Sequence, residues 1–309
     1  MRKTMADDAA ERPARSPVLA YATLVVVMVM WSGNMIVGRA VHDTIPPFTL
    51  ALVRWTGATL LALPFAMRHL VRERNALIVN WKPVVLLGLI GVAAFNAFAY
   101  SGLRHTTATN GLLLQAAVPA LVLAFNYLFF RASSTMLDIV GVALSILGVM
   151  FVVLRGDPLA ILALDFNSGD LLILCGIVCW SAYTSLLKLR PALHPLVFLV
   201  AIFSIGILAM APLAAGEWVA GAGVKLTWPV AGAFAYVAIF PSLVGYLLYN
   251  AAVRDLGAGR AGQMLTLMPL FGALLAAVLL SEPLHAYHLT GMVLILGGIA
   301  LSAWRGRSH

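Results

Sequence analysis

Polar and aromatic side chains recur at helical spacing inside apolar stretches of this chain, where they could contact a solute. Between residues 107 and 130, Gly111, Gln115 and Pro119 follow one another at intervals of four. Residues three or four apart are neighbours on a helix surface, so these three share a face. Because amides make no favourable contact with lipid, this face predicts either a polar cavity or a bond to another helix.

Five further apolar stretches carry similar side chains. Aromatic rings offer a face to an ammonium group, and amides and hydroxyls donate and accept hydrogen bonds. This combination suits a small amphipathic solute such as an amino acid. For any single residue, the alternative is a hydrogen bond that only joins two helices. The expected solute-binding residues are Trp31, Asn34, Asn96, Tyr100, Gln115, Trp180, Tyr183, Tyr246, Tyr249, Asn250, Gln263 and Thr266.

One basic residue, Arg54, also falls inside an apolar stretch, the one at residues 47–67. At ~1.5 Å per residue its backbone lies roughly 10 Å from the start of that stretch. Ionisable groups at such depth commonly serve function, which favours a solute contact. A long guanidinium side chain can also reach back to the membrane surface and serve structure alone. The sequence leaves both interpretations open.

The elements that must position these side chains are membrane-spanning helices. Of the 309 residues, 62% are hydrophobic and 10% are charged, and the mean hydropathy is +0.96. A soluble domain is roughly half apolar and a quarter charged, and about 20 apolar residues cross a bilayer as a helix. The sequence therefore predicts an all-α integral membrane protein with ten spans, at 18–40, 47–67, 82–102, 107–130, 135–154, 170–188, 194–215, 228–250, 259–280 and 286–304.

The basic residues are distributed unequally between the two sides of these spans. Of the 20 Lys and Arg residues, 15 lie on the side of the N-terminus, four lie on the other side, and Arg54 lies within a span. The positive-inside rule places both termini in the cytoplasm, with the protein in the cell inner membrane. The net charge of +8 is thus a topology signal and does not indicate nucleic-acid binding. Residues 1–17 and 305–309 are expected to be cytoplasmic tails, the first disordered, with 155–169 a periplasmic linker.

Two halves of the chain align with each other at a nearly constant offset. The matched pairs are Trp31 with Trp180, Pro47 with Pro195, Pro64 with Pro212, Pro119 with Pro269, Gly141 with Gly291, and Gly148 with Gly298. The sequence therefore predicts two repeats, residues 18–154 and 170–304, of five spans each. An odd number of spans makes the second repeat enter the membrane from the opposite side. Inverted repeats are typical of secondary transporters, whose solute binds between the repeats.

Prolines and glycines inside the spans are candidate hinges for alternating access. Proline inside a helix frees a backbone carbonyl and creates a bend. Gly91 aligns with Pro241, and Pro119 with Pro269, so each repeat holds an equivalent pair. The alternative is that these residues form static kinks needed only for packing.

Several kinds of chemistry have no residues to support them. All twelve Asp and Glu residues lie outside the middle of the spans, so no proton relay is evident. We therefore favour transport of the solute down its own concentration gradient. The alternative is proton coupling through a group at a helix end. No phosphate-binding glycine loop, HExxH or GxSxG motif occurs. Cys175 and Cys179 have the spacing of helix packing. We expect no enzyme activity, cofactor or metal. A channel is the rival of another class, although no charged pore ring supports it.

At this point the sequence resembles the drug/metabolite transporter superfamily, and within it the EamA-type exporters. The resemblance rests on the helix 2 arginine in LVRWTGATLL, on the proline of each repeat, and on the ending LMPLFGALLAAVLLSEPLHAYHLTGMVLILGGIAL with Glu282. Ala132 stands where the first repeat would carry the matching Glu. The chain is most similar to YddG-type exporters, which implies aromatic and other amino acids as cargo. A multidrug or cationic-compound exporter of the same fold is the alternative. We expect a monomer whose partners are the solute and the bilayer.

Overall fold

The structure is a computed structural model, and it describes residues 16–41, 43–106, 114–163, 167–280 and 285–304. Every regular element in these ranges is helical, and no strand occurs among them. Eight helices of the described part are long and apolar enough to cross a membrane. They are Pro17–Gly38, Pro47–Val79, Trp81–Gly102, Met136–Val153, Ser168–Leu189, Pro195–Val219, Trp228–Leu256 and Ala286–Ala303.

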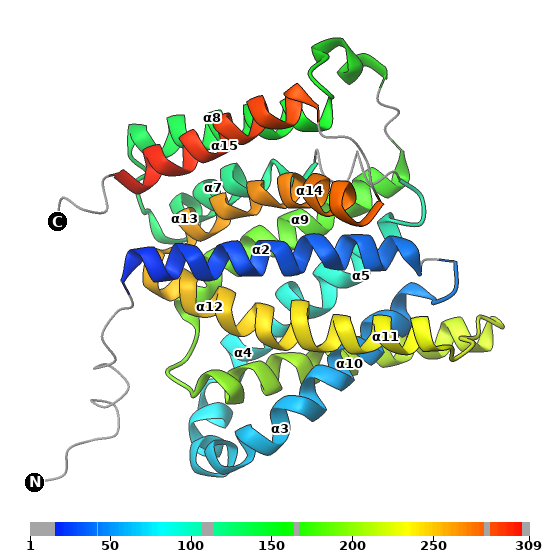
Figure 1. Cartoon of the computed structure of the whole chain (residues 1–309). Helices are drawn as coiled ribbons and strands as arrows, with labels where there is room; N and C mark the ends of the chain where they lie inside the picture. Colours follow the sequence, from blue (N-terminus) through cyan, green and yellow to red (C-terminus); the bar gives the residue numbers. More distant parts are fainter. Residues whose placement is uncertain (1–15, 42, 107–113, 164–166, 281–284, 305–309) are drawn as a thin grey trace, which may run out of the picture.

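The helices divide into the following elements, of which the α-helices are labelled in Figure 1. In the first half they are α2 (Pro17–Ala40), α3 (Pro47–Val79), α4 (Trp81–Gly88), η1 (Leu89–Ala94), α5 (Phe95–Gly102), α7 (Val118–Phe130), α8 (Met136–Val153) and η2 (Pro158–Ala163). In the second half they are α9 (Ser168–Leu186), η3 (Leu187–Leu189), α10 (Pro195–Val219), α11 (Trp228–Val237), η4 (Ala238–Val244), α12 (Gly245–Leu256), α13 (Ala258–Gln263), η5 (Met264–Leu267), α14 (Met268–Leu280) and α15 (Ala286–Trp304).

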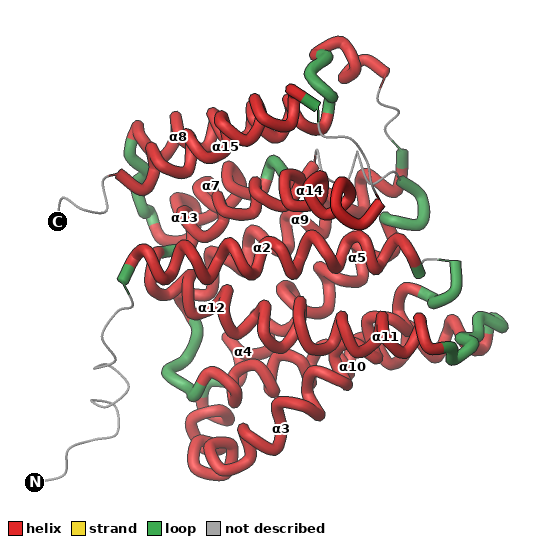
Figure 2. The backbone as a smooth tube through the Cα atoms, in the orientation of Figure 1, coloured by secondary structure: helices red, strands yellow, loops and turns green. Residues whose placement is uncertain are grey.

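Two of the ten expected spans, 107–130 and 259–280, are interrupted rather than continuous. The second is divided into α13, the 3-10 segment η5 and α14. In the first, a turn precedes α7 (Figure 2), and residues 107–113 lie outside the described part. Pro119 and Pro269 are each the second residue of the helix after the break. Each proline therefore stands at the start of a regular α-helix, and its role as a hinge stays a prediction. Proline is well tolerated in a first turn, where its missing N–H would have no partner.

In each half, a π-helical segment lies within an equivalent span that is otherwise a continuous helix. η1 contains Gly91 and η4 contains Pro241, the pair that the sequence aligns. A π segment leaves carbonyls outside the regular α-helical ladder, and such segments often occur at functional sites. In both halves the chain continues straight into an α-helix, α5 or α12.

Helix boundaries follow local capping signals in most places. Thr135 and Asp138 form a capping box at the start of α8, and Asn167 and Asp170 form another at the start of α9. Each pair satisfies backbone N–H groups that the first turn of a helix leaves free. These caps explain why acidic residues stand at span ends. The helix α3 continues beyond the expected end of the second span at residue 67 and reaches Val79 without a break.

The packing of helices repeats when the two halves are exchanged. α3 packs on α10, and α8 packs on α15, so each of these pairs maps onto itself. The pair α2 and α12 maps onto the pair α9 and α5, and the two helices of each pair are in contact. Gly141 lies against Gly298, and Gly148 against Gly291, between α8 and α15. Reciprocal contacts of this kind are the mark of an internal two-fold axis.

The two long helices α3 and α10 cap each other at both ends. The Glu217 carboxylate of α10 accepts hydrogen bonds from the N–H groups of Phe48 and Thr49, at 3.0 and 2.8 Å. At the other end, the Glu73 carboxylate of α3 accepts from His194 N–H at 2.7 Å. A carboxylate at a helix N-terminus is stabilised by free N–H groups and by the helix dipole. The two helices are thus joined at both ends.

The start of α2 and the end of α15 lie at the same end of the bundle, on the left in Figure 1. The turn between α12 and α13 lies at this end as well. The connection between α2 and α3 lies at the opposite end. The chain therefore crosses the bundle from one end to the other in α2.

Candidate functional site

A cluster of five aromatic side chains lies between α2, α9 and α12. The Trp31 ring centroid is 5.1 Å from that of Trp180 and 5.0 Å from that of Tyr249. Trp180 lies 5.2 Å from Tyr183 and 5.5 Å from Tyr246. All five are buried. Rings at these separations stabilise one another beyond the area they bury, so the cluster forms a rigid floor.

The polar atoms of this floor bond to the two π-helical segments. Tyr246 donates its hydroxyl hydrogen to the carbonyl of Gly91 at 2.7 Å, and Trp31 Nε1 donates to the carbonyl of Pro241 at 2.9 Å. Each bond thus joins an aromatic residue to a carbonyl within η1 or η4. At Gly91 an added Cβ would overlap the Tyr183 ring. Close packing of η1 against Tyr183 therefore favours glycine at this position, independently of the proposed hinge role of Gly91.

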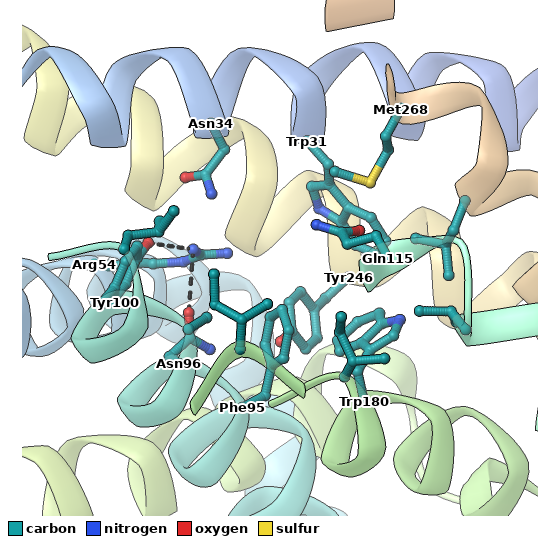
Figure 3. A pocket seen from close by; sticks show the side chains of 16 residues that line it. Trp31, Asn34, Arg54, Phe95, Asn96, Tyr100, Gln115, Trp180, Tyr246 and Met268 are labelled. Carbon is teal, nitrogen blue, oxygen red and sulfur yellow. Dashed lines mark hydrogen bonds between the residues drawn. The ribbon is translucent and has the colours of Figure 1, made fainter. Parts of the chain in front are cut away.

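A cavity opens above this floor, with about 760 Å³ of space between side chains when its mouth is counted. Figure 3 shows Asn34, Gln115 and Arg54 reaching toward its centre from separate elements. Its lining consists of Trp31, Asn34, Arg54, Phe95, Asn96, Ala99, Tyr100, Leu103, Gln115, Val118, Ile173, Ile177, Trp180, Tyr246, Leu265 and Met268.

Arg54 is the positive charge of this cavity and is only 3% exposed. Its Nε donates to Ser242 Oγ at 2.5 Å, and its Nη1 donates to Tyr100 Oη at 2.7 Å and to Asn96 Oδ1 at 3.4 Å. The guanidinium carbon lies 4.7 Å from the centre of the Trp55 ring. Among the described residues, no carboxylate forms an ion pair with it. The guanidinium is therefore held in place by neutral groups and keeps its charge uncompensated.

Seven of the twelve expected solute-binding residues line this cavity, namely Trp31, Asn34, Asn96, Tyr100, Gln115, Trp180 and Tyr246. Tyr183, Tyr249 and Asn250 lie in or beside the aromatic floor, where Tyr183 donates its hydroxyl hydrogen to Asn250 Oδ1 at 2.9 Å. Tyr249 lies 3.1 Å from the hydroxyl of Thr184. These three residues support the floor and do not line the cavity above it.

Gln263 and Thr266 are placed away from the first cavity. Gln263 Nε2 donates to Ser145 Oγ at 3.1 Å, and the residue lines a second cavity. Thr266 donates its hydroxyl hydrogen to the carbonyl of Gln263 at 2.8 Å, one helical turn back. The hydroxyl of Thr266 therefore has its hydrogen-bond partner within its own helical segment.

Sequence reasoning missed the apolar half of the lining, for example Phe95, Ile177 and Met268. Apolar side chains face lipid, neighbouring helices and cavities alike, so their identity carries no signal of position. It also did not single out Ser242 as the partner of Arg54. The described residues contain no group of three His, Cys, Asp or Glu residues that could hold a metal ion.

Comparison with known proteins gives the family of this chain. The sequence pattern of the EamA-like transporter family matches residues 18–154 and again 167–304. The chain is 26% identical over 232 residues to "Uncharacterized transporter YyaM" of Bacillus subtilis (strain 168), which covers 74% of each protein. It is 26% identical over 296 residues to "Probable amino-acid metabolite efflux pump" of Salmonella typhimurium (strain LT2), which covers 90% of this chain and 93% of that one.

A solved crystal structure has the same fold. It superposes with a TM-score of 0.73 at 17% identity and covers 94% of this chain and 98% of its own. The family pattern covers most of the chain in two consecutive copies, and the structure is a bundle of apolar helices long enough to span a bilayer. The chain is therefore a multi-pass membrane protein that belongs to the EamA-like transporter family of the drug/metabolite transporter superfamily.

Proposed function

We propose that this protein exports amino acids across the cell inner membrane by alternating access, with the solute bound in the cavity above the aromatic floor. In this proposal ten spans form two inverted repeats, residues 18–154 and 170–304, joined by a periplasmic linker at 155–169. Both termini are cytoplasmic, and the protein acts as a monomer. The unequal distribution of Lys and Arg supports the orientation, and the reciprocal glycine contacts between α8 and α15 support the symmetry.

The observation that carries the proposal is the buried, uncompensated guanidinium of Arg54. A buried charge is costly unless it is paired, and arginine matches a carboxylate with two parallel hydrogen bonds. Opposite it, the amide of Asn34 hangs over the cavity (Figure 3), and its Oδ1 has no hydrogen-bond partner in the described part of the chain. An amino acid supplies both groups, with its carboxylate on Arg54 and its ammonium toward Asn34.

The remaining cavity wall fits an apolar or aromatic side chain. Phe95, Trp180 and Met268 line it, and their faces can pack against an aliphatic chain or an aromatic ring. The Salmonella typhimurium relative, named as a probable amino-acid metabolite efflux pump, also supports amino acids as cargo. A cationic drug fits less well, because it would meet the positive charge of Arg54 without a carboxylate to balance it.

Counterflow in proteoliposomes tests the cargo. Liposomes that contain the purified protein are loaded with one unlabelled amino acid and diluted into a trace of the same labelled compound. We expect accumulation for amino acids with apolar or aromatic side chains, and none for their amides, which lack the carboxylate. Uptake of a cationic drug with no uptake of any amino acid would overturn the proposal. Stepwise single-channel currents in planar bilayers would show a channel instead.

A further inference from the structure

A second cavity lies at the end of the bundle where α2 begins and α12 meets α13. It encloses about 730 Å³ when its mouth is counted. The lining comes from α7, α8, η3, α12, α13 and α15 and from the connection between α7 and α8. Two basic residues, Lys188 and Arg260, stand there among polar side chains. The lining consists of Leu123, Asn126, Ala132, Ser133, Ser134, Asp138, Val142, Lys188, Leu256, Gly257, Ala258, Gly259, Arg260, Gln263 and Ser302.

The two cations of this cavity are not neutralised by the protein. Within the described ranges, neither Lys188 nor Arg260 forms an ion pair with a carboxylate. The Lys188 ammonium lies 4.9 Å from the centre of the Phe130 ring. The single acid of the lining, Asp138, caps the start of α8, where its Oδ2 accepts from Thr135 N at 3.0 Å and from Thr135 Oγ1 at 2.8 Å. Because two cations stand against one carboxylate, the net charge of the lining is positive.

The innermost lining is polar and only partly satisfied. Gln263, Ser302 and Asn126 are 2%, 3% and 7% exposed. Asn126 Oδ1 and Ser302 Oγ have no hydrogen-bond partner in the described part of the chain. Buried polar atoms are nearly always hydrogen-bonded, so a cavity with two unpaired ones at its base is suited to a ligand that carries polar hydrogens. A lipid headgroup at the mouth would leave this base unfilled.

The two interrupted helices form the wall between the two cavities. On α7, Val118 lines the first cavity and Leu123 lines the second. On the other interrupted segment, Leu265 of η5 lines the first cavity and Gln263 of α13 lines the second. The helices meet closely there, since a Cβ added at Gly262 would lie 3.1 Å from Val122. Separation of α7 from α13 would therefore join the cavities.

We propose that this second cavity is a loading site on the cytoplasmic face, where Lys188 and Arg260 capture the carboxylate of the solute before it reaches Arg54. This inference rests on the proposed function and names the site at which export begins. The ammonium of the same amino acid is placed to donate to Asn126 Oδ1. A small anionic group is the shared chemistry, and a phosphate-bearing lipid headgroup is the other source of it, which the experiment separates.

Sided transport measurements test the loading site. Everted membrane vesicles expose the cytoplasmic face, and right-side-out vesicles expose the other face. The variant is Lys188→Gln combined with Arg260→Gln, and the matched control is Arg72→Gln, which removes an exposed charge on α3. We expect the double variant to raise the KM from the cytoplasmic face about tenfold, because hydrogen bonds to charged groups are lost. The KM from the other face stays within about twofold.

Two further measurements separate the outcomes. Arg260→Lys keeps the charge and should keep the cytoplasmic KM within about threefold, which guards against a merely misfolded double variant. Equal KM changes on both faces, or none, would overturn the loading site while wild-type amino-acid transport leaves the proposed function standing. If the effect occurs in vesicles with phosphatidylglycerol but not in pure phosphatidylcholine, a lipid headgroup occupies the cavity and the solute site is wrong. If the wild type carries no amino acid, both proposals fall.

Discussion

Replacement of Arg54 by glutamine should weaken solute binding strongly while changing the stability of the protein little. The side chain is 3% exposed and donates three hydrogen bonds to neutral groups, at 2.5, 2.7 and 3.4 Å. Hydrogen bonds to charged groups are worth ~1.5–3 kcal/mol each. The loss of one such bond to the solute carboxylate weakens binding by roughly 10- to 150-fold. Arg54→Lys keeps the charge without the planar fork and should lose about tenfold.

Stability distinguishes the two roles that the sequence leaves open for Arg54. If the guanidinium serves only packing, its removal leaves Asn96 and Tyr100 unpaired and costs about 3–5 kcal/mol. If it is held uncompensated for a solute, removal also relieves a buried charge, and the two effects offset each other. We then expect a change in Tm of Arg54→Gln within about 4 °C.

The assay is equilibrium binding of a labelled amino acid that counterflow has identified, with thermal unfolding of the same preparation. Arg68→Gln is the control, because Arg68 lies on the same helix, is exposed and lines neither cavity. We expect the control to bind like the wild type. Binding by Arg54→Gln within threefold of the wild type, together with a large loss of Tm, would refute the assignment of Arg54 to the solute.

Three further outcomes follow from the structure. Pro119→Ala and Pro269→Ala should each slow counterflow about tenfold while equilibrium binding stays unchanged, because a continuous helix replaces the break before each proline. Unchanged flux in both variants would show that the two prolines have no role in alternating access. Gly148→Val should lower the free energy of unfolding by about 2 kcal/mol, since a Cβ there would lie 2.8 Å from the Gly291 carbonyl; thermal unfolding measures it, and an unchanged Tm would contradict the tight contact of α8 and α15. Proteoliposome flux should not depend on an imposed pH gradient, because Asp138, the acid that lines a cavity in the described part of the chain, stands at a helix end. Strong dependence would show proton coupling.

Local sequence signals determined the helices and most of their ends. Apolar stretches about as long as a bilayer is thick predict spans without reference to other parts of the chain. Capping residues such as Thr135 with Asp138, and Asn167 with Asp170, act on the backbone within four residues. The aligned prolines and glycines likewise indicate a duplicated chain from residue type alone. The family was recognisable from the same stretches, and the match to the EamA-like pattern confirms it.

The tertiary structure decided which polar residues share a cavity. Gln115 and Gln263 stand on equivalent interrupted helices, yet the first lines one cavity and the second lines the other. Arg54 donates a hydrogen bond to Ser242, which is 188 residues away along the chain, and Thr49 donates one to Glu217, which is 168 residues away. Helical periodicity fixes the face on which a side chain lies, because the helix is built from local hydrogen bonds. What that face meets depends on helices brought together from distant parts of the chain, and only their packing settles it.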